Sequence, residues 1–213
     1  MRPYNQSTKN YWQIKGQTMI PWRTQLSVVA VLTILAHGAL PSQTQETPPA
    51  GRESRVTLLL VGHGGPATDF PTLTEYFRLH GRNSDESRAI ENEMMHWPRN
   101  ERNDSYWAGF MKIVRELERS GGFHSVRYAF NEMCAPTVEE ALEVSKGDRP
   151  DTIVVTSIMM TSGGVHSEKD IPLSIQNFRD QNPEIPVIYA WPYAEADIVK
   201  FLNGHIGRFT STN

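Results

Sequence analysis

Two histidines each follow a run of residues that is typical of a buried strand. His63 lies in the run VTLLLVGHGG, which begins at Val56, and His166 follows TIVVTSIMMTSGGV, which begins at Thr152. In an open parallel sheet, ligands bind in the crevice beyond the carboxyl ends of the strands. Glycines beside both histidines allow a partner to approach the backbone closely. Because imidazole is a common metal ligand, two such side chains at one sheet edge predict a metal-binding site.

A carboxylate joins the two histidines if the strands are ordered 2-1-3-4, as in flavodoxin-like sheets. Glu132 follows the second strand-like run, so Glu132, His63 and His166 would then stand on three neighbouring strand ends. Adjacent strands are about 4.8 Å apart, so the outer two residues are separated by roughly 10 Å at the backbone. Side chains that lean inward close that gap onto one ion. Two imidazoles and a carboxylate suit Co²⁺, Fe²⁺, Ni²⁺ or Zn²⁺ and leave coordination positions open.

The elements that must position these residues alternate along the chain from Val56 onward. This alternation predicts an α/β domain over residues 56–213 with a parallel four-stranded sheet flanked by helices. The expected strands are Val56–Val61, Ser125–Phe130, Thr152–Met159 and Pro186–Ala190. Four helices are expected from apolar stripes at helical spacing. The first covers Tyr106–Leu117, with Asp104 as its cap and Gly121-Gly122 as its stop, and the second follows the capping box at Thr137. The other two cover Ile171–Phe178 and Ile198–Leu202, and Gly204 is expected to end the last one. Asp170 is interpreted as a helix cap rather than a ligand.

A long insertion separates the first strand from the first of these helices. It spans residues 66–103, with short helices expected near Leu73–Leu79 and Glu86–His96. Connections of this length in compact domains are usually functional or disordered. Because the insertion follows the His63 loop directly, we expect a lid over the crevice.

Three segments together resemble a known family. VGHGG, FNEMCAPTVEEAL and SGGVHSEKDIP are similar to the short-form class II tetrapyrrole chelatases, which include the sirohydrochlorin cobaltochelatases and ferrochelatases of the CbiX type. The resemblance covers roughly Val56 to Leu202 apart from the insertion. It implies a flavodoxin-like, chelatase-like fold and insertion of a divalent metal, Co²⁺ or Fe²⁺ or else Ni²⁺, into a planar tetrapyrrole without ATP or any other nucleotide cofactor. The metal is then a substrate.

The resemblance also implies roles for individual residues. His63 and His166 match the histidines that hold the metal and accept protons, and Glu132 matches the acidic residue after the second strand. Sirohydrochlorin-like substrates carry many carboxylates, to which arginine forks are complementary. The substrate-binding residues that we expect on this basis are Arg78, Arg82 and Arg88 of the insertion, together with Gly163 and Gly164.

The first 55 residues differ from the rest of the chain. Arg23, the apolar run LSVVAVLTILA at residues 26–36 and small residues after it have the layout of a secretory signal within residues 1–42. The run is shorter than the roughly 20 apolar residues of a spanning helix. Residues 43–55 are polar and contain Pro and Gly, which indicates a linker. We therefore expect export to the periplasm or another extracytoplasmic space. An uncleaved anchor as the only membrane contact, or a cytoplasmic protein with a disordered leader, remain alternatives.

Composition limits the partners of the protein. The chain has 213 residues, a net charge of −3 and a single cysteine, Cys134. This balance does not imply a nucleic-acid partner, and one cysteine excludes an internal disulfide framework and multi-cysteine metal sites. The unit is about half of a two-lobed chelatase, so a homodimer is expected to bring two crevices together. A monomer closed by the insertion is the alternative, and a metal-delivery protein without turnover is the alternative function.

Overall fold

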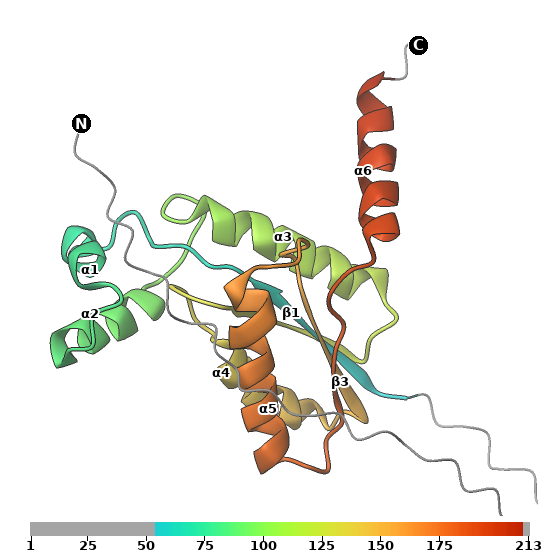
Figure 1. The fold of residues 1–213 in the computed structure, drawn as a ribbon, viewed down its shortest axis with the longest axis horizontal. Helices are drawn as coiled ribbons and strands as arrows, with labels where there is room; N and C mark the ends of the chain where they lie inside the picture. The colour runs from blue at the N-terminus through green and yellow to red at the C-terminus, as the bar shows by residue number, and fades with distance from the viewer. Residues whose placement is uncertain (1–53, 211–213) are drawn as a thin grey trace, which may run out of the picture. The chain divides into compact units, whose positions relative to one another are not determined.

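A four-stranded parallel sheet forms the centre of the computed structural model, which describes residues 54–210 (Figure 1). The strands are β1 (Val56–Gly62), β2 (Ser125–Phe130), β3 (Thr152–Ser157) and β4 (Val187–Tyr189), in the order β2-β1-β3-β4. The predicted class and order are thus confirmed. β1 is buried along almost its whole length because strands flank it on both sides and helices cover both of its faces.

Helices cover the two faces of the sheet unequally (Figure 1). The helices α4 (Val138–Ser145) and α5 (Ile171–Gln181) pack on the face that carries Leu59 and Val155. On the opposite face, α3 (Ser105–Ser120) packs against Leu60 and Phe130. This arrangement follows from the right-handed crossovers that parallel strands require.

The helix boundaries follow the capping signals in the sequence. The Asp104 side chain accepts a hydrogen bond from the Trp107 amide at the start of α3. Thr137 and Glu140 form the expected capping box of α4. A short 3₁₀ turn, η1 (Lys146–Asp148), follows α4, and a π-helical turn, η2 (His166–Asp170), precedes α5.

The insertion after β1 folds into two short helices, α1 (Leu73–Leu79) and α2 (Asp85–Met95). Both lie within a residue of the predicted bounds. The insertion buries an apolar cluster of its own, made of Ala67, Phe70, Tyr76, Leu79, Ile90 and Met94. The insertion is therefore a compact part of the domain rather than an extended loop.

The last helix, α6 (Glu195–Thr210), is longer than expected. Gly204 was predicted to end it, and this prediction is wrong because the helix continues through Gly204 to Thr210. A glycine inside a helix costs about 1 kcal/mol relative to alanine, which is too little to stop a helix by itself. No residue of α6 is buried.

The predicted leader at residues 1–42 and nearly all of the linker lie outside the described residues. Among residues 54–210, no helix has both the length and the apolar character that crossing a membrane requires.

Candidate metal centre

The candidate site lies where β1, β2 and β3 end. His63 follows β1 directly, and Glu132 lies two residues beyond β2. Parallel pairing continues past the strands, because the Glu132 amide donates a hydrogen bond of 3.0 Å to the His63 carbonyl oxygen. His166 comes later in the loop after β3, at the first position of η2. The sheet order thus brings together residues that are about 100 positions apart in sequence.

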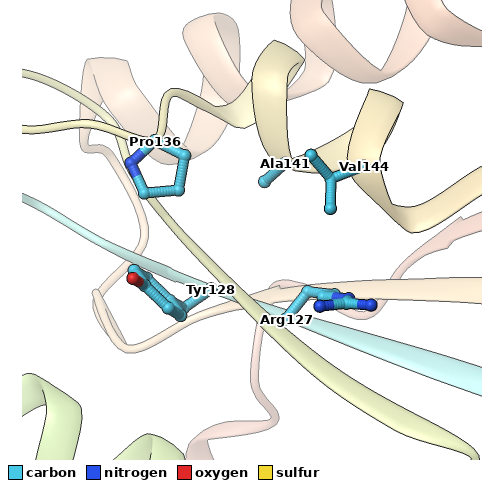
Figure 2. A pocket seen from close by; sticks show the side chains of 5 residues that line it. All are labelled: Arg127, Tyr128, Pro136, Ala141 and Val144. Atoms are coloured by element: carbon cyan, nitrogen blue, oxygen red, sulfur yellow. The ribbon is translucent and has the colours of Figure 1, made fainter. Parts of the chain in front are cut away.

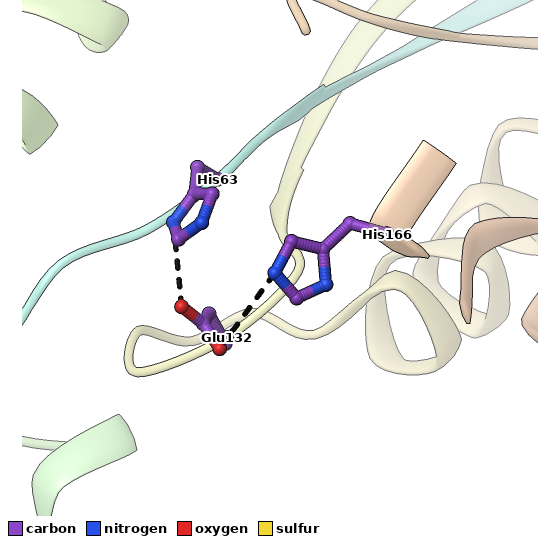
Figure 3. A group of neighbouring side chains, drawn as sticks. All are labelled: His63, Glu132 and His166. Carbon is purple, nitrogen blue, oxygen red and sulfur yellow. Dashed lines mark ion pairs between the residues drawn. The ribbon is translucent and has the colours of Figure 1, made fainter. Parts of the chain in front are cut away.

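The three predicted ligands converge on one point (Figure 3). One ligand atom from each of His63, Glu132 and His166 lies within 4.8 Å of the others. Glu132 stands between the imidazoles, with Oε1 3.4 Å from His63 Nδ1 and Oε2 3.9 Å from His166 Nε2. The imidazole rings are edge to face, with centroids 4.9 Å apart. This His–Glu–His triad is a set of borderline-hard donors suited to a divalent transition metal.

The triad is open to solvent on one side. The exposed fractions of the side chains are 43% for His63, 25% for Glu132 and 29% for His166. Three protein ligands leave coordination positions free, as in metal sites that carry out chemistry rather than maintain structure. A bound ion would therefore be accessible to a second molecule.

A glycine makes the close approach of the two loops possible. Gly64 has a φ of +97°, and a Cβ at this position would lie 1.9 Å from the Glu132 carbonyl oxygen. Any other residue would therefore separate the His63 and Glu132 loops. Gly65 has open space around it and no such constraint.

Two polar side chains hold the His166 ring. Asp170 Oδ2 lies 2.7 Å and Asn131 Nδ2 2.6 Å from His166 Nδ1. Nδ1 either donates a proton to Asp170 or accepts one from the Asn131 amide; with the proton donated to Asp170, Nε2 is left as the free ligand atom on the side of Glu132. Asp170 occupies the N-cap position of α5 as interpreted, but its side chain makes no capping hydrogen bond there and contacts His166 instead.

The π-helical turn explains why Asp170 reaches the histidine. The Ile171 amide bonds to the His166 carbonyl oxygen, five residues back, and this wider turn places His166 and Asp170 on one side. Single π turns inside helices occur frequently at functional sites. The spacing of four residues between a histidine and an acidic residue was the sequence signal for this contact.

His63 is held mainly through its backbone. Its amide donates a 2.8 Å hydrogen bond to the Tyr106 hydroxyl at the start of α3. Its Nδ1 also lies 3.0 Å from the Gly64 carbonyl oxygen. Nδ1, which lies 3.4 Å from Glu132 Oε1, is therefore in contact with both the Gly64 carbonyl oxygen and the triad carboxylate.

An arginine that the sequence did not single out ties the insertion to both site loops. Arg99 is almost fully buried and pairs with Asp104 at 3.0 Å. Its guanidinium also donates to the carbonyl oxygens of Gly65, Met94 and Met133. Gly65 lies two residues after His63, and Met133 directly after Glu132, so Arg99 fixes the distance between the loops. Only the folded chain reveals this role, because an arginine in a polar insertion usually faces solvent.

The predicted substrate contacts lie outside the triad. Arg78 pairs with Glu75 and Arg88 with Asp85, each within its own helix. Arg82 continues the chain after α1, where its amide bonds to the Leu79 carbonyl oxygen. Gly163 and Gly164 are exposed just before His166, and both bond to Glu168. The two glycines therefore border the site, whereas the arginines belong to the insertion.

A separate pocket of about 220 Å³ lies between β2 and α4 (Figure 2). Its lining is Arg127, Tyr128, Pro136, Ala141 and Val144. No triad residue contributes to it, and it is smaller than the roughly 300–1,000 Å³ of typical small-molecule sites. The pocket is therefore distinct from the metal centre.

The fold and the triad define a parallel α/β protein with a candidate His–Glu–His metal centre at the carboxyl edge of its sheet. Comparison with protein families shows a match to the CbiX family model over residues 101–202, which include Glu132 and His166. The sirohydrochlorin cobaltochelatase of Methanopyrus kandleri is 39% identical over 61 residues. That alignment spans 29% of this chain and 42% of the relative. The predicted resemblance to the CbiX-type chelatases is confirmed.

Two solved structures are also similar. A cobalamin (vitamin B12) biosynthesis CbiX protein from Marinobacter aquaeolei VT8 aligns over 72% of this chain and 98% of its own, with 14% identity and a TM-score of 0.43. The sirohydrochlorin chelatase SirB from Bacillus subtilis subspecies spizizenii, in complex with cobalt, aligns over 75% and 56%, with 15% identity and a TM-score of 0.47.

Proposed function

We propose that this protein is a chelatase that inserts a divalent metal, Co²⁺ or Fe²⁺ and in third place Ni²⁺, into a sirohydrochlorin-like tetrapyrrole without ATP. The observation that carries the proposal is the convergence of His63, Glu132 and His166 on one point open to solvent. The match to the CbiX family and the named activity of the Methanopyrus kandleri relative support the same reaction class.

The reaction requires bases as well as metal ligands. Insertion exchanges two pyrrole N–H protons for one dication, so groups near the ion must accept two protons. Glu132 lies between the two imidazoles and supplies a negative charge that offsets the charge of the ion. A neutral imidazole can hold the metal first and accept a proton once the metal has moved to the macrocycle. The triad therefore combines metal delivery and proton removal.

Asp170 and Asn131 act as positioning residues in this scheme. Their contacts with His166 Nδ1 keep Nε2 directed to the ion. When His166 accepts a proton, the Asp170 carboxylate stabilises the imidazolium that results. For the acidic periphery of the substrate we propose Arg78, Arg82 and Arg88, whose insertion follows the His63 loop.

A metal-delivery protein on the same fold is the second candidate. The observation that favours it is that three side chains of the protein converge on one point without any contribution from a tetrapyrrole. Both functions need the triad, and only the chelatase needs turnover.

An anaerobic absorbance assay separates the two functions. The full chain is incubated with sirohydrochlorin and Co²⁺ beside His63→Ala, His166→Ala and a control, His124→Ala, in which the lost histidine contacts η1 instead of the site. We expect metal insertion above the spontaneous rate, lost in the first two variants and kept in the control. Stoichiometric Co²⁺ binding without turnover would favour metal delivery, and absence of Co²⁺ binding would contradict both.

For residues 1–42 we propose export of the protein, through a cleaved signal or an uncleaved anchor. The support is the basic flank followed by the short apolar run. N-terminal sequencing of the protein recovered from cell fractions tests this, and an intact N-terminus in the cytoplasmic fraction would contradict it.

A further inference from the structure

The turn that carries His166 leaves one main-chain carbonyl group without its usual partner. In a regular α-helix the Ile171 amide would donate a hydrogen bond to the Ser167 carbonyl oxygen. In η2 this amide donates to the His166 carbonyl oxygen instead. In the π-helical register the donor to Ser167 would be residue 172, but Pro172 has no N–H. Neither position from which a helix supplies a donor therefore serves Ser167.

A hydroxyl group from β4 supplies the missing donor. The Tyr189 hydroxyl donates a hydrogen bond of 3.0 Å to the Ser167 carbonyl oxygen. Ser167 is only 1% exposed, and a buried carbonyl group without a partner costs free energy. Burial raises the pKa of Tyr189 to about 12, so the hydroxyl keeps its proton and remains a donor at neutral pH. Tyr189 therefore satisfies the carbonyl group that the π-helical turn leaves unpaired.

Tyr189 is itself held in place by its neighbours. Its ring packs against the main apolar core of the sheet and stacks on Trp191, with ring centroids 5.9 Å apart. The Trp191 indole donates a hydrogen bond of 3.0 Å to the Met159 carbonyl oxygen. Met159 lies near the start of the loop between β3 and η2, and Ser167 lies just after its end. The two aromatic residues thus hold the His166 loop at both ends.

The helical register of this turn determines where His166 lies. Ile171 and Ile175 are buried in the core and fix the position of α5. An α-helix advances by about 100° per residue, so loss of the extra residue of the π turn would rotate the preceding residues by about that angle relative to α5. His166 would then leave the side on which it contacts Asp170 and Glu132.

We propose that Tyr189 is a positioning residue for His166. Its hydroxyl group keeps the turn in the π-helical register and so keeps the imidazole at the triad. The inference deepens the proposed function and rests on it for the consequence that metal binding depends on Tyr189. The effect on the turn itself does not depend on any reaction.

Co²⁺ binding compares two tyrosines that each lose one hydroxyl group. Tyr189→Phe removes the hydrogen bond to Ser167, and the control Tyr193→Phe removes one of equal length to the carbonyl oxygen of Ser157, where β3 ends. By isothermal titration we expect a Kd for Co²⁺ that is roughly 10- to 100-fold higher in Tyr189→Phe and unchanged in the control. The visible absorption bands of bound Co²⁺ report its ligand set, and we expect those of Tyr189→Phe to resemble those of His166→Ala. Parent-like affinity and bands in Tyr189→Phe would overturn the positioning role.

A second test without metal keeps this inference separate from the proposed function. Urea denaturation gives the free energy of unfolding of Tyr189→Phe, Asp170→Asn and the double variant. If the hydroxyl holds the turn in which Asp170 contacts His166, Asp170→Asn should cost less in the Tyr189→Phe background than in the parent protein. Additive losses would overturn the inference. Non-additive losses in a protein that binds no Co²⁺ would support the role of Tyr189 in the turn and contradict the proposed function alone.

Discussion

At the scale of single residues, the site depends on groups that orient ligands as much as on the ligands. His166 presents one nitrogen to Glu132 because Asp170 and Asn131 contact the other. The loops that carry His63 and Glu132 stay close because Gly64 has no side chain to separate them. Substitutions beside the triad should therefore change metal binding without removing a ligand.

Replacing Asp170 by Asn removes the carboxylate that fixes the His166 ring. We expect the affinity for Co²⁺ to fall by roughly 10- to 100-fold, which is the usual effect of losing such a partner of a metal-bound histidine. Isothermal titration of the purified protein measures it. Lys169→Ala, one residue earlier in the same exposed turn, is the control, and equal affinities in both variants would contradict the positioning role.

Replacing Gly64 by Ala places a Cβ against the Glu132 carbonyl oxygen and imposes a positive φ on a residue with a side chain. We expect the free energy of unfolding to fall by about 1–3 kcal/mol. Gly65→Ala has free space around its Cβ and should stay within about 0.5 kcal/mol of the parent protein. Urea denaturation compares the two, and similar values would show that the loops are not in close contact.

At the scale of elements, polar contacts connect parts of the chain that are far apart in sequence. Arg99 links α2, the His63 loop and the Glu132 loop. Asp148 in η1 links the end of α4 to β2 through Ser125 and Arg127. Each contact has a stability consequence of its own.

Truncating Arg99 to Ala leaves Asp104 buried without its partner. Breaking a buried pair in this way typically costs about 3–5 kcal/mol, and we expect a loss in that range by urea denaturation. Arg99→Lys should recover little, because one ammonium cannot reproduce the planar fork that contacts several carbonyl oxygens. The exposed Arg102→Ala is the control. If Arg99→Lys kept the full stability of the parent protein, the role of the guanidinium in holding the loops together would be contradicted.

The Asp148–Arg127 pair should make stability depend on pH. The hydrogen bond from Arg127 to Asp148 is the main cause that lowers the pKa of Asp148 in the folded protein. The contribution of this pair to the free energy of unfolding is therefore fully present above the unfolded-state pKa of about 3.9, and it is lost as pH falls through the lower folded-state pKa. Asp148→Asn should cost about 1 kcal/mol at pH 7, since Arg127 is partly exposed. Melting curves of both proteins should converge below pH 3.9, and a constant difference would contradict this.

The sequence predicted the elements better than the contacts between them. The runs beginning at Val56 and Thr152 are strands because β-branched and aliphatic residues suit the centre of a sheet that is covered on both faces. The run beginning at Ser125 is more polar and forms an edge strand. Their order then brought His63, Glu132 and His166 together as expected. The contacts of Arg99 with the two site loops were missed, because they depend on loop conformations that no periodicity encodes. The Asp170 contact was missed although its four-residue spacing from His166 was a signal for it.

At the scale of the whole molecule, an ion bound at the triad should stabilise the folded state. Unfolding separates His63, Glu132 and His166, so the ion binds the native state alone. With free Co²⁺ at 100 times its Kd, the expected gain is about 2.7 kcal/mol, or roughly 5–10 °C in Tm. Differential scanning calorimetry measures this shift. Mg²⁺, which prefers oxygen ligands, should give almost none, and an equal shift in His63→Ala would contradict binding at the triad.

The separate apolar core of the insertion has a consequence for how such a chain can diverge. Tyr76, Leu79, Ile90 and Met94 pack with one another, and Met133 of the Glu132 loop packs against their cluster, so we expect most substitutions in α1 and α2 to be compensated within the insertion. The central sheet does not need to change when this segment does, provided that the contacts of Arg99 and Met133 with the insertion are kept. The insertion can thus vary while the candidate metal centre beside it stays the same. Natural variation or engineering can alter the surroundings of the metal centre there while the sheet and its ligands stay the same.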